Sequence, residues 1–428
     1  MDQSPEKRLL DNGIPLVVER LPHLRSVSLG VWVETGTRDE FPHEHGISHF
    51  LEHTFFKGTA TRSAERIAQE IDGLGGEMNA FTSREQTAFY TKVLSDRLDE
   101  ATDLLTDILT RSTFEPELLD RERQVVVEEI RMVEDDPEEW VHDLHGAHMW
   151  GGDTPLGRNI LGTEASVAGL GPEQIRAYLA RRYTPDQMVV SAAGNLDPEQ
   201  LFAHLNATLG QMDTPAAGDT GPGDAPAPTG GAPDLHYREL EQVHVCVGAR
   251  SLSMGHPDRF GMYVLNDALG GGSSSRLFQE IREKRGLAYS VYSGLSSYRD
   301  CGELTIYAGC SGASLPQVGE LIRCEIDRLC DTPVPEDELQ RIKGHLQGTL
   351  VLGLESTFNR MSRLAQDELQ WRAPQSLDSI LEQIERVDAE QVMRLARFAF
   401  DPAYVCPTIL GALKGLPNDL FGPLPVRG

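Results

Sequence analysis

The sequence predicts an α+β fold made of two similar halves, each a mixed or antiparallel sheet with helices on one face. Three observations indicate this fold. Stretches rich in β-branched residues, such as 14–20 and 26–34, alternate with amphipathic segments of helical period, such as 96–111. A segment rich in Pro, Gly and Ala at 214–233 divides the chain near its middle. The pattern of the first half then recurs after this segment.

The first half is expected to supply a sheet and the helices that cover it. Its first two strands, at 14–20 and 26–34, are rich in β-branched residues and alternate in part. Ser63 directly precedes an amphipathic run and is therefore the expected N-cap of a helix. The elements predicted next, in chain order, are helix 63–73, strands 77–82 and 86–94, helices 96–111, 117–135 and 172–182, strand 187–194 and helix 198–209.

The second half repeats this outline. Strand 243–249 corresponds to strand 27–34, and helix 258–269 takes the place of the helix that contains His49 and His53. Strand 302–310 and helix 314–331 correspond to strand 86–94 and helix 96–111. The segment between the halves lacks apolar periodicity, which is typical of a flexible linker. We therefore divide the chain into residues 1–213, a linker at 214–233 and residues 234–428.

The composition indicates a reducing, aqueous compartment. No apolar run reaches the 18 residues that suggest a membrane-spanning helix, and the first residues lack the apolar core of a signal peptide. The 6 cysteines form no Cys-x-x-Cys pair, so we expect free, buried thiols and no cysteine zinc site. We expect a cytoplasmic location.

The stretch His49-Phe-Leu-Glu-His53 carries the chemistry of the first half. On a helix, His49 and His53 lie one turn apart on the same face, where two imidazoles can bind one Zn²⁺. Glu52 lies next to them and can act as the general base on a zinc-bound water. The order His-x-x-Glu-His is the inverse of the commoner zinc-protease motif.

A third ligand is expected from the helix at 117–135. Glu122 and Glu129 are seven residues apart and share one helix face, whereas Glu128 is rotated away from it. We predict that Glu129 is the ligand and that Glu122 is a carboxylate that orients a ligand from behind. A solvated acidic helix face explains the same residues equally well, and this explanation stays open.

Three other candidate sites have simpler structural explanations. His45 lies four residues before His49, but its neighbours favour a capping residue. The loop 270–275 is rich in Gly and Ser, but no Gly-Lys-Ser/Thr follows it, which argues against phosphate binding. The triplet of histidines with a spacing of three lies among Trp and Leu, which favours a packing helix: His142, His145 and His148.

Further motifs extend the pattern around the His-x-x-Glu-His stretch. A glutamate lies 76 residues beyond His53 and another lies seven before that one. The other motifs are Gly75-Gly-Glu-Met-Asn-Ala80, Thr87-Ala-Phe-Tyr90, Pro155-Leu-Gly157 with Ile160-Leu-Gly162, and Ser275-Arg-Leu277 with Gly286-Leu-Ala-Tyr-Ser290. Together they resemble the pitrilysin/insulysin family of zinc peptidases. The closest resemblance is to its processing-peptidase branch, which includes the mitochondrial processing peptidase.

This resemblance implies a zinc endopeptidase shaped like a clamshell, which cleaves short or unfolded peptides in an enclosed chamber. Residues 1–213 would be the catalytic, zinc-binding half, and 234–428 a metal-free half that contributes to substrate binding. The resemblance places Asn79 and Ala80 where the family holds its substrate strand. It also implies that Arg276 and Tyr289 donate hydrogen bonds to the substrate carbonyl and the developing oxyanion.

The charge of the chain bears on its partners. The 66 acidic side chains outnumber the 39 basic ones and give a formal net charge of −27. Such a chain repels nucleic acid and anionic membranes, so we expect neither as a partner. Two explanations stay open, namely solubility alone and an acidic chamber that favours basic peptides.

The expected assembly is a homodimer, or a heterodimer with a metal-free homologue. Two competing functions explain less of the sequence than a peptidase does. A non-catalytic scaffold subunit would not need the intact set of metal and base residues. A metalloenzyme of different chemistry would not need the peptide-strand and Arg/Tyr features.

Overall fold

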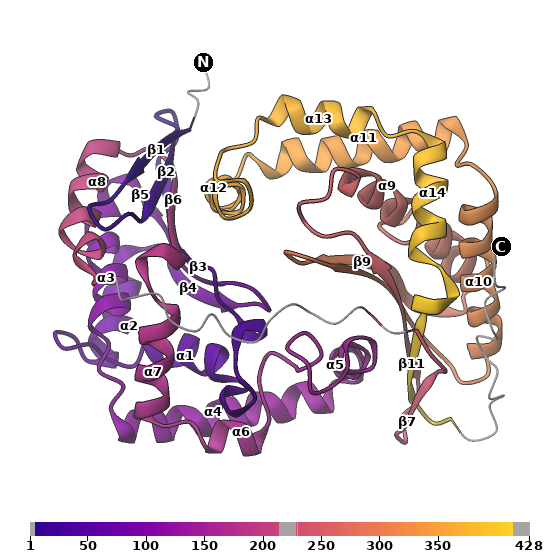
Figure 1. Ribbon diagram of the computed structural model, residues 1–428, viewed down its shortest axis with the longest axis horizontal. Helices are drawn as coiled ribbons and strands as arrows, with labels where there is room; N and C mark the ends of the chain where they lie inside the picture. The colour runs from indigo at the N-terminus through magenta and orange to yellow at the C-terminus, as the bar shows by residue number, and fades with distance from the viewer. Residues whose placement is uncertain (1–4, 214–227, 229, 414–428) are drawn as a thin grey trace. The chain divides into compact units, whose positions relative to one another are not determined.

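The computed structural model describes residues 5–213, 228 and 230–413 (Figure 1). These residues form two compact units, each with its own sheet and helices, which confirms the α+β fold. The described residues of the first unit fall within 5–131, 159–213 and 351–375, and those of the second within 132–158, 228–350 and 376–413. Most of the expected linker, residues 214–227 and 229, lies outside the described residues.

The first unit contains a six-stranded mixed sheet. Its strands, from edge to edge, are β1 (Glu6–Leu9), β2 (Pro15–Arg20), β6 (Met188–Gly194), β3 (Ser26–Val33), β5 (Thr87–Leu94) and β4 (Glu77–Thr82). Strands β2 and β6 run parallel, and the other neighbours are antiparallel. Strand β4 is thus an edge strand, paired only with β5 among the described strands.

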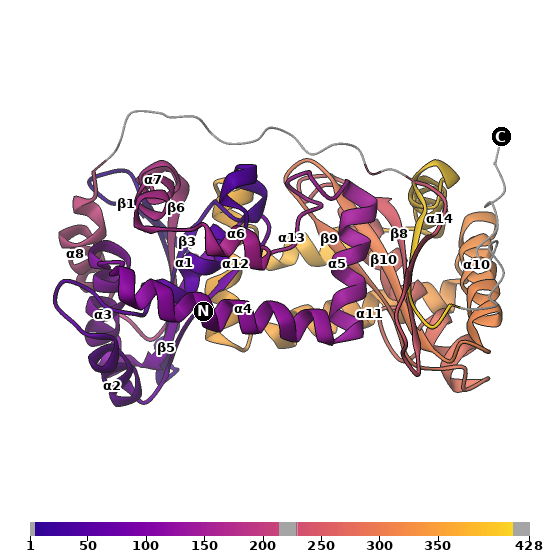
Figure 2. The same cartoon turned by 90° about the horizontal axis from the view of Figure 1, so that it is seen from below.

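Most helices of the first unit pack on one face of this sheet (Figures 1 and 2). Their apolar side chains, including Phe50, Phe55 and Leu104, form one core with Leu29 and Val31 of β3. This burial explains the 3.6-residue period seen in the sequence. These helices are α1 (Ile47–Phe55), α2 (Ala64–Leu74), α3 (Leu98–Arg111), α4 (Pro116–Asp135), α6 (Glu164–Ala168), α7 (Pro172–Arg182) and α8 (Pro198–Ala207).

The opposite face of the same sheet is covered by α12 (Thr357–Trp371), a helix from the second half of the sequence. Met361 and Leu364 pack against Val17, Trp32 and Val189 of the sheet, and none of these five is more than 4% exposed. The sequence predicted helices on one face of the sheet only. The structure has these helices and, in addition, α12 on the opposite face. Because β3 and β6 carry apolar residues on both sides, both of their faces need a cover.

The second unit contains a five-stranded sheet of the same kind. Its strands, from edge to edge, are β7 (Asp234–Tyr237), β11 (Cys406–Gly411), β8 (Val243–Ser251), β10 (Gly302–Cys310) and β9 (Ala288–Ser297). Only β7 and β11 run parallel to each other among these neighbours. Its helices include α9 (Arg259–Leu269), α10 (Leu315–Asp331), α11 (Glu336–Gly353), α13 (Leu377–Glu385) and α14 (Ala389–Ala399).

The second unit mirrors the first in taking one helix from the other half of the sequence. Helix α5 (Pro137–Trp150) packs on β8 and β11, where His145 and His148 both contact the hydroxyl of Thr408 at 3.1 Å. The ring of His142 stacks on that of Tyr307 of β10, with centroids 5.5 Å apart. The three histidines at 142, 145 and 148 therefore pack against the sheet, as we expected from the sequence. The two compact units therefore differ from the sequence halves 1–213 and 234–428. The first unit includes α12 from the second half, and the second unit includes α5 from the first half.

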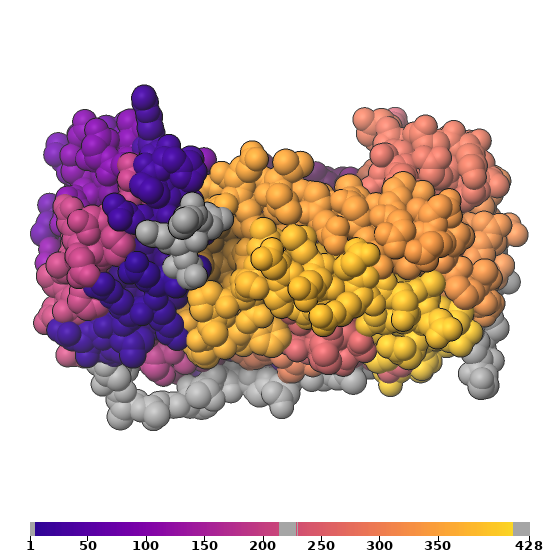
Figure 3. Space-filling model, turned by 90° about the horizontal axis from the view of Figure 1, so that it is seen from above, coloured from indigo at the N-terminus to yellow at the C-terminus, as the bar shows by residue number. Residues whose placement is uncertain are grey.

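The predicted elements are present with ends within two residues of those expected. Ser63 caps α2 and accepts a hydrogen bond from the amide of Arg66, as expected. All six cysteines are free. Helix α13 lies at the surface with only Ile384 buried, among the yellow segments that face the viewer in Figure 3. Across the described part of the chain, every helix is too short or too polar to cross a membrane.

Candidate metal centre

Helix α1 carries the His-x-x-Glu-His motif, and its first turn is held from behind by a buried carboxylate. Glu40 is fully buried, and its two oxygens each accept one backbone hydrogen bond at 2.8 Å, from Gly46 and Ser48. These amides are among the donors that a helix start leaves unpaired. Gly46 has φ 89°, and a Cβ there would lie 2.8 Å from the carbonyl oxygen of Leu161. Sequence reasoning missed Glu40, since the only signal was a lone glutamate in a loop.

One face of α1 packs into the core, and the other carries the histidines of the motif. Ile47, Leu51 and Phe55 are at most 1% exposed and fix the helix on the sheet. The imidazoles of His49 and His53 then lie side by side, with ring centroids 4.7 Å apart. This is the arrangement that the spacing of four predicted.

Helix α4 brings the third candidate ligand to the two histidines. Oε2 of Glu129 lies 3.5 Å from Nε2 of His49 and 3.2 Å from Nε2 of His53. Ligands bonded to a tetrahedral zinc at 2.0–2.1 Å are about 3.4 Å from one another, so these spacings fit the ion. Glu128 points elsewhere and pairs with Arg131 at 2.7 Å.

The ligand set is distinct within the described chain. The ligand atoms of His49, His53 and Glu129 all lie within 4.8 Å of one another, and no other such group of three occurs in residues 5–213, 228 and 230–413. His45 is not part of it, because its Nε2 lies 3.1 Å from both oxygens of Asn159. The chemistry of two imidazoles and one carboxylate is that of a catalytic zinc site.

Glu122 lies behind His53, as predicted for a carboxylate that orients a ligand. Its Oε1 lies 3.0 Å from Nδ1 of His53, and its Oε2 lies 2.9 Å from Nζ of Lys57. The His53–Glu122 contact fixes which ring nitrogen faces Glu129. Lys57 was not among the predicted residues, although its place four residues after His53 was a usable signal.

The two histidines have opposite pKa shifts in the metal-free protein. Burial lowers the pKa of His49 to about 4, and the neighbouring His53 adds to this. Burial also acts to lower the pKa of His53, but hydrogen bonds to Glu122 and Glu129 outweigh it and raise the value to about 9. At neutral pH, His49 is thus neutral and His53 holds the proton that a metal must displace.

Glu52 is half-buried beside this set. Burial raises its pKa, while contacts with Thr82 of β4 and with His53 act in the opposite direction. A carboxylate whose pKa is raised toward neutrality is a better proton acceptor, which suits a general base. The contact with Thr82 also ties Glu52 to the edge strand β4.

Asn79 and Ala80 lie on this edge strand, opposite Tyr90 and Phe89 of β5. Asn79 is exposed and Ala80 is buried. The side-chain oxygen of Asn79 accepts a hydrogen bond from the amide of Ala80 at 2.8 Å. The amide of Ala80 therefore bonds to the exposed Asn79 side chain and not to the backbone of a further strand.

Arg276 and Tyr289 belong to the second unit, whereas the residues described above belong to the first. Arg276 pairs with Glu338 through two contacts of 2.9 Å. Tyr289 is 80% exposed. The guanidinium of Arg282 lies over its ring, 5.1 Å from the ring centroid of Tyr289.

Comparison with known proteins decides the family. Residues 16–164 match the family described as Insulinase (Peptidase family M16), and residues 169–346 match the Peptidase M16 inactive domain. An uncharacterized zinc protease of Streptomyces coelicolor is 44% identical over 91% of this chain and 85% of its own length. The chain belongs to peptidase family M16. Another M16 relative, an uncharacterized zinc protease of Bacillus subtilis, is 42% identical over 93% of this chain and 96% of its own.

The fold agrees with this M16 assignment. The crystal structure of a protease from Helicobacter pylori superposes with a TM-score of 0.88 over 96% of this chain and 100% of that chain, at 21% identity. The match to the inactive domain spans α9, which carries no histidine. The resemblance to the pitrilysin/insulysin peptidases is therefore confirmed, and its processing-peptidase branch stays a prediction.

Proposed function

We propose that this M16 member is a zinc-dependent endopeptidase. One observation carries the proposal: the ligand atoms of His49, His53 and Glu129 converge at the spacing of a zinc site, with Glu52 beside them. Both histidines would bind the ion through Nε2, and Glu129 through its carboxylate. Zn²⁺ bound there would supply a Lewis acid that acidifies water and polarises a carbonyl.

Glu52 performs the proton transfers of hydrolysis. It takes a proton from the attacking water as the water oxygen bonds to the carbonyl carbon of the peptide. It then delivers this proton to the amide nitrogen as the C–N bond breaks. Burial raises the pKa of Glu52, which makes its carboxylate a stronger proton acceptor for the first of these transfers.

Short or unfolded peptides are the proposed substrates, bound along β4. A sheet edge recognises an extended backbone through main-chain hydrogen bonds, whatever the side chains are. A peptide carbonyl would take over the amide of Ala80 from the Asn79 side chain. Since Thr82 of the same strand contacts Glu52, the bound backbone would lie beside the base.

Arg276 and Tyr289 are proposed to stabilise the charge that develops on the substrate carbonyl. A guanidinium and a phenol are both suitable donors for an oxyanion. The bidentate ion pair with Glu338 fixes the Arg276 guanidinium in one orientation. Replacing Tyr289 with Phe should then lower kcat by about 10²-fold, with the zinc content unchanged.

Metal content and peptide cleavage test the proposal together. The full chain is purified, its zinc is measured, and a mixed peptide library is incubated with it and mapped by mass spectrometry. Stoichiometric zinc with internal cleavage sites is expected, and the Glu52→Gln variant should give zinc without cleavage. A wild-type chain that binds no zinc, or one that cleaves as fast with Gln at position 52, would overturn the proposed function.

A further inference from the structure

Lys57 lies directly after helix α1, which carries the His-x-x-Glu-His motif, and its side chain contacts the carboxylate of Glu122. Its ammonium lies 2.9 Å from Oε2 of Glu122, and the other oxygen of the same carboxylate lies 3.0 Å from Nδ1 of His53. The side chain of Glu122 is 7% exposed and that of Lys57 is 37% exposed. Lys57, Glu122 and His53 thus form a continuous chain of contacts that ends at a proposed zinc ligand.

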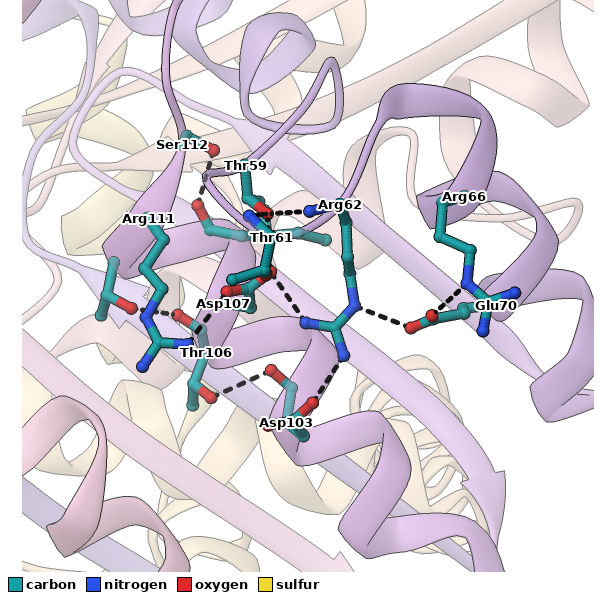
Figure 4. A network of polar contacts seen from close by, with 12 residues as sticks. Thr59, Thr61, Arg62, Arg66, Glu70, Asp103, Thr106, Asp107, Arg111 and Ser112 are labelled. Carbon is teal, nitrogen blue, oxygen red and sulfur yellow. Dashed lines mark hydrogen bonds and ion pairs between the residues drawn. The ribbon is translucent and has the colours of Figure 1, made fainter.

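The segment that presents Lys57 is itself held firmly. Figure 4 shows Asp107 of α3 at the centre of a polar network. Its carboxylate, 3% exposed, accepts hydrogen bonds from Thr59, Thr61 and Arg62 at 2.7–2.8 Å. Further contacts close the network: Arg62 with Glu70 and Asp103, the amide of Ala60 with the carbonyl of Arg111, and the amide of Thr113 with the carbonyl of Gly58.

We propose that Lys57 is a positioning residue of the zinc site, which holds the Glu122 carboxylate in the orientation that aligns His53. The inference rests on the proposed function, since it presupposes that His53 binds the metal. The amide of Lys57 donates a hydrogen bond to the carbonyl of Thr54 at 3.1 Å, and the network around Asp107 holds residues 58–62 directly after it. The backbone that carries Lys57 is therefore held on both sides.

The physical reason is the charge and freedom of a buried carboxylate. A buried carboxylate is stabilised by the cations that contact it, and removal of one of them favours a rearrangement that exposes the carboxylate to water. Without Lys57, Glu122 can turn away from His53, whose ring then loses its fixed orientation. Loss of a group that orients a ligand directly costs about 10- to 100-fold in metal affinity, so the lower end, about 10-fold, is expected for Lys57.

A matched control exists in the same unit. Lys7 contacts Oε1 of the buried Glu368 at 2.7 Å, and its side chain is 35% exposed, much like that of Lys57. The pair Lys7–Glu368 lies on β1 and α12, and neither residue belongs to the ligand set. Removal of either lysine therefore strips an ammonium from a buried carboxylate, but only Lys57 is connected to His53.

The experiment measures zinc affinity of the full-length chain by competition with a chromogenic chelator, together with Tm of the metal-free protein. Lys57→Met should weaken zinc binding about 10-fold, while Lys57→Arg, which keeps the charge, should recover most of the affinity. Lys7→Met should leave zinc affinity unchanged even if it lowers Tm as much. In a Glu122→Gln background, Lys57→Met should have no further effect, because the two residues act through one contact.

Three outcomes overturn the inference: unchanged zinc affinity in Lys57→Met, an equal loss in Lys7→Met, or full additivity of Lys57→Met with Glu122→Gln. These outcomes are distinct from failure of the proposed function, in which wild-type protein itself would not bind zinc. A folded Lys57→Met protein, shown by its Tm, ensures that any affinity loss is local to the site.

Discussion

Nδ1 of His53 lies 3.0 Å from Oε1 of Glu122, while Nε2 of the same ring lies 3.2 Å from Oε2 of Glu129. One imidazole is thus held between two carboxylates from the same helix, seven residues apart. Glu122 contacts the ring at Nδ1, and Glu129 contacts it at Nε2, the nitrogen through which we propose that His53 binds zinc. Because the roles are divided in this way, mutations can separate metal binding, ligand orientation and proton transfer.

Glu129→Gln should lower zinc occupancy far more than Glu128→Gln. Glu129 places an oxygen within 3.5 Å of both Nε2 atoms, whereas the Glu128 side chain is 69% exposed and pairs with Arg131. Zinc per chain after dialysis against a weak chelator is the measurement. Equal occupancy in the two variants would contradict the ligand assignment.

Glu52→Gln should retain zinc and lose about 10²- to 10⁴-fold in kcat, because it removes a general base and not a ligand. The contacts that shift its pKa put it beside the ligand set without making it a member. Steady-state cleavage of a fluorogenic peptide, with zinc content as the control, checks this. Near wild-type turnover would show that another group accepts the proton.

Zinc binding at neutral pH should release about one proton. The pKa of His49 is lowered to about 4, so it is already neutral, and the lowered pKa of Glu129 makes it already anionic. His53, with its pKa raised to about 9, must lose its proton to bind the metal. Apparent affinity should therefore rise about tenfold per pH unit up to pH 9.

Calorimetry in buffers of different ionisation enthalpy measures this proton. Glu122→Gln removes a contact that raises the pKa of His53, so the proton release near pH 7.5 should fall in that variant. No dependence of the binding enthalpy on the buffer in the wild-type protein would contradict the assigned protonation states.

Basic peptides should be cleaved faster than acidic ones at low salt. The net charge of −27 attracts cationic substrates over long range, and salt screens this attraction beyond about 8–10 Å near physiological ionic strength. The measurement is kcat/KM for matched Lys-rich and Glu-rich peptides at two salt concentrations. If the ratio stays at one under both conditions, the charge contributes to solubility only.

Residues 1–213 expressed alone should fail to give a stable fold. Without α12 (Thr357–Trp371), the apolar side chains of Val17, Trp32 and Val189 on one sheet face lose their cover. Circular dichroism and thermal melting of the fragment test this, and addition of residues 234–428 should restore a cooperative transition. A fragment that melts like the intact chain, or cleaves peptides at its rate, would contradict the expectation.

The sequence by itself determined the local elements and the chemistry they carry. Helical period put His49 and His53 on one face, and the spacing of seven put Glu122 and Glu129 on one face of another helix. Ser63 identified a helix start, and the recurrence of elements indicated two similar halves. The helix faces and the helix start depend on residues close in sequence, and the recurrence is a comparison of two sequence patterns, so all of them can be recognised without knowledge of the fold.

Only the tertiary structure decided which faces meet. In the fold, Glu122 contacts His53, which lies 69 residues away in the sequence, and Lys57 contacts Glu122. Glu40 accepts a hydrogen bond from the amide of Gly46 at the start of α1. It also exchanged α5 and α12 between the two sheets, which no repeat in the sequence indicated. The physical reason is that periodicity states that a face is apolar or charged, whereas its partner is selected by packing and charge pairing over the whole chain.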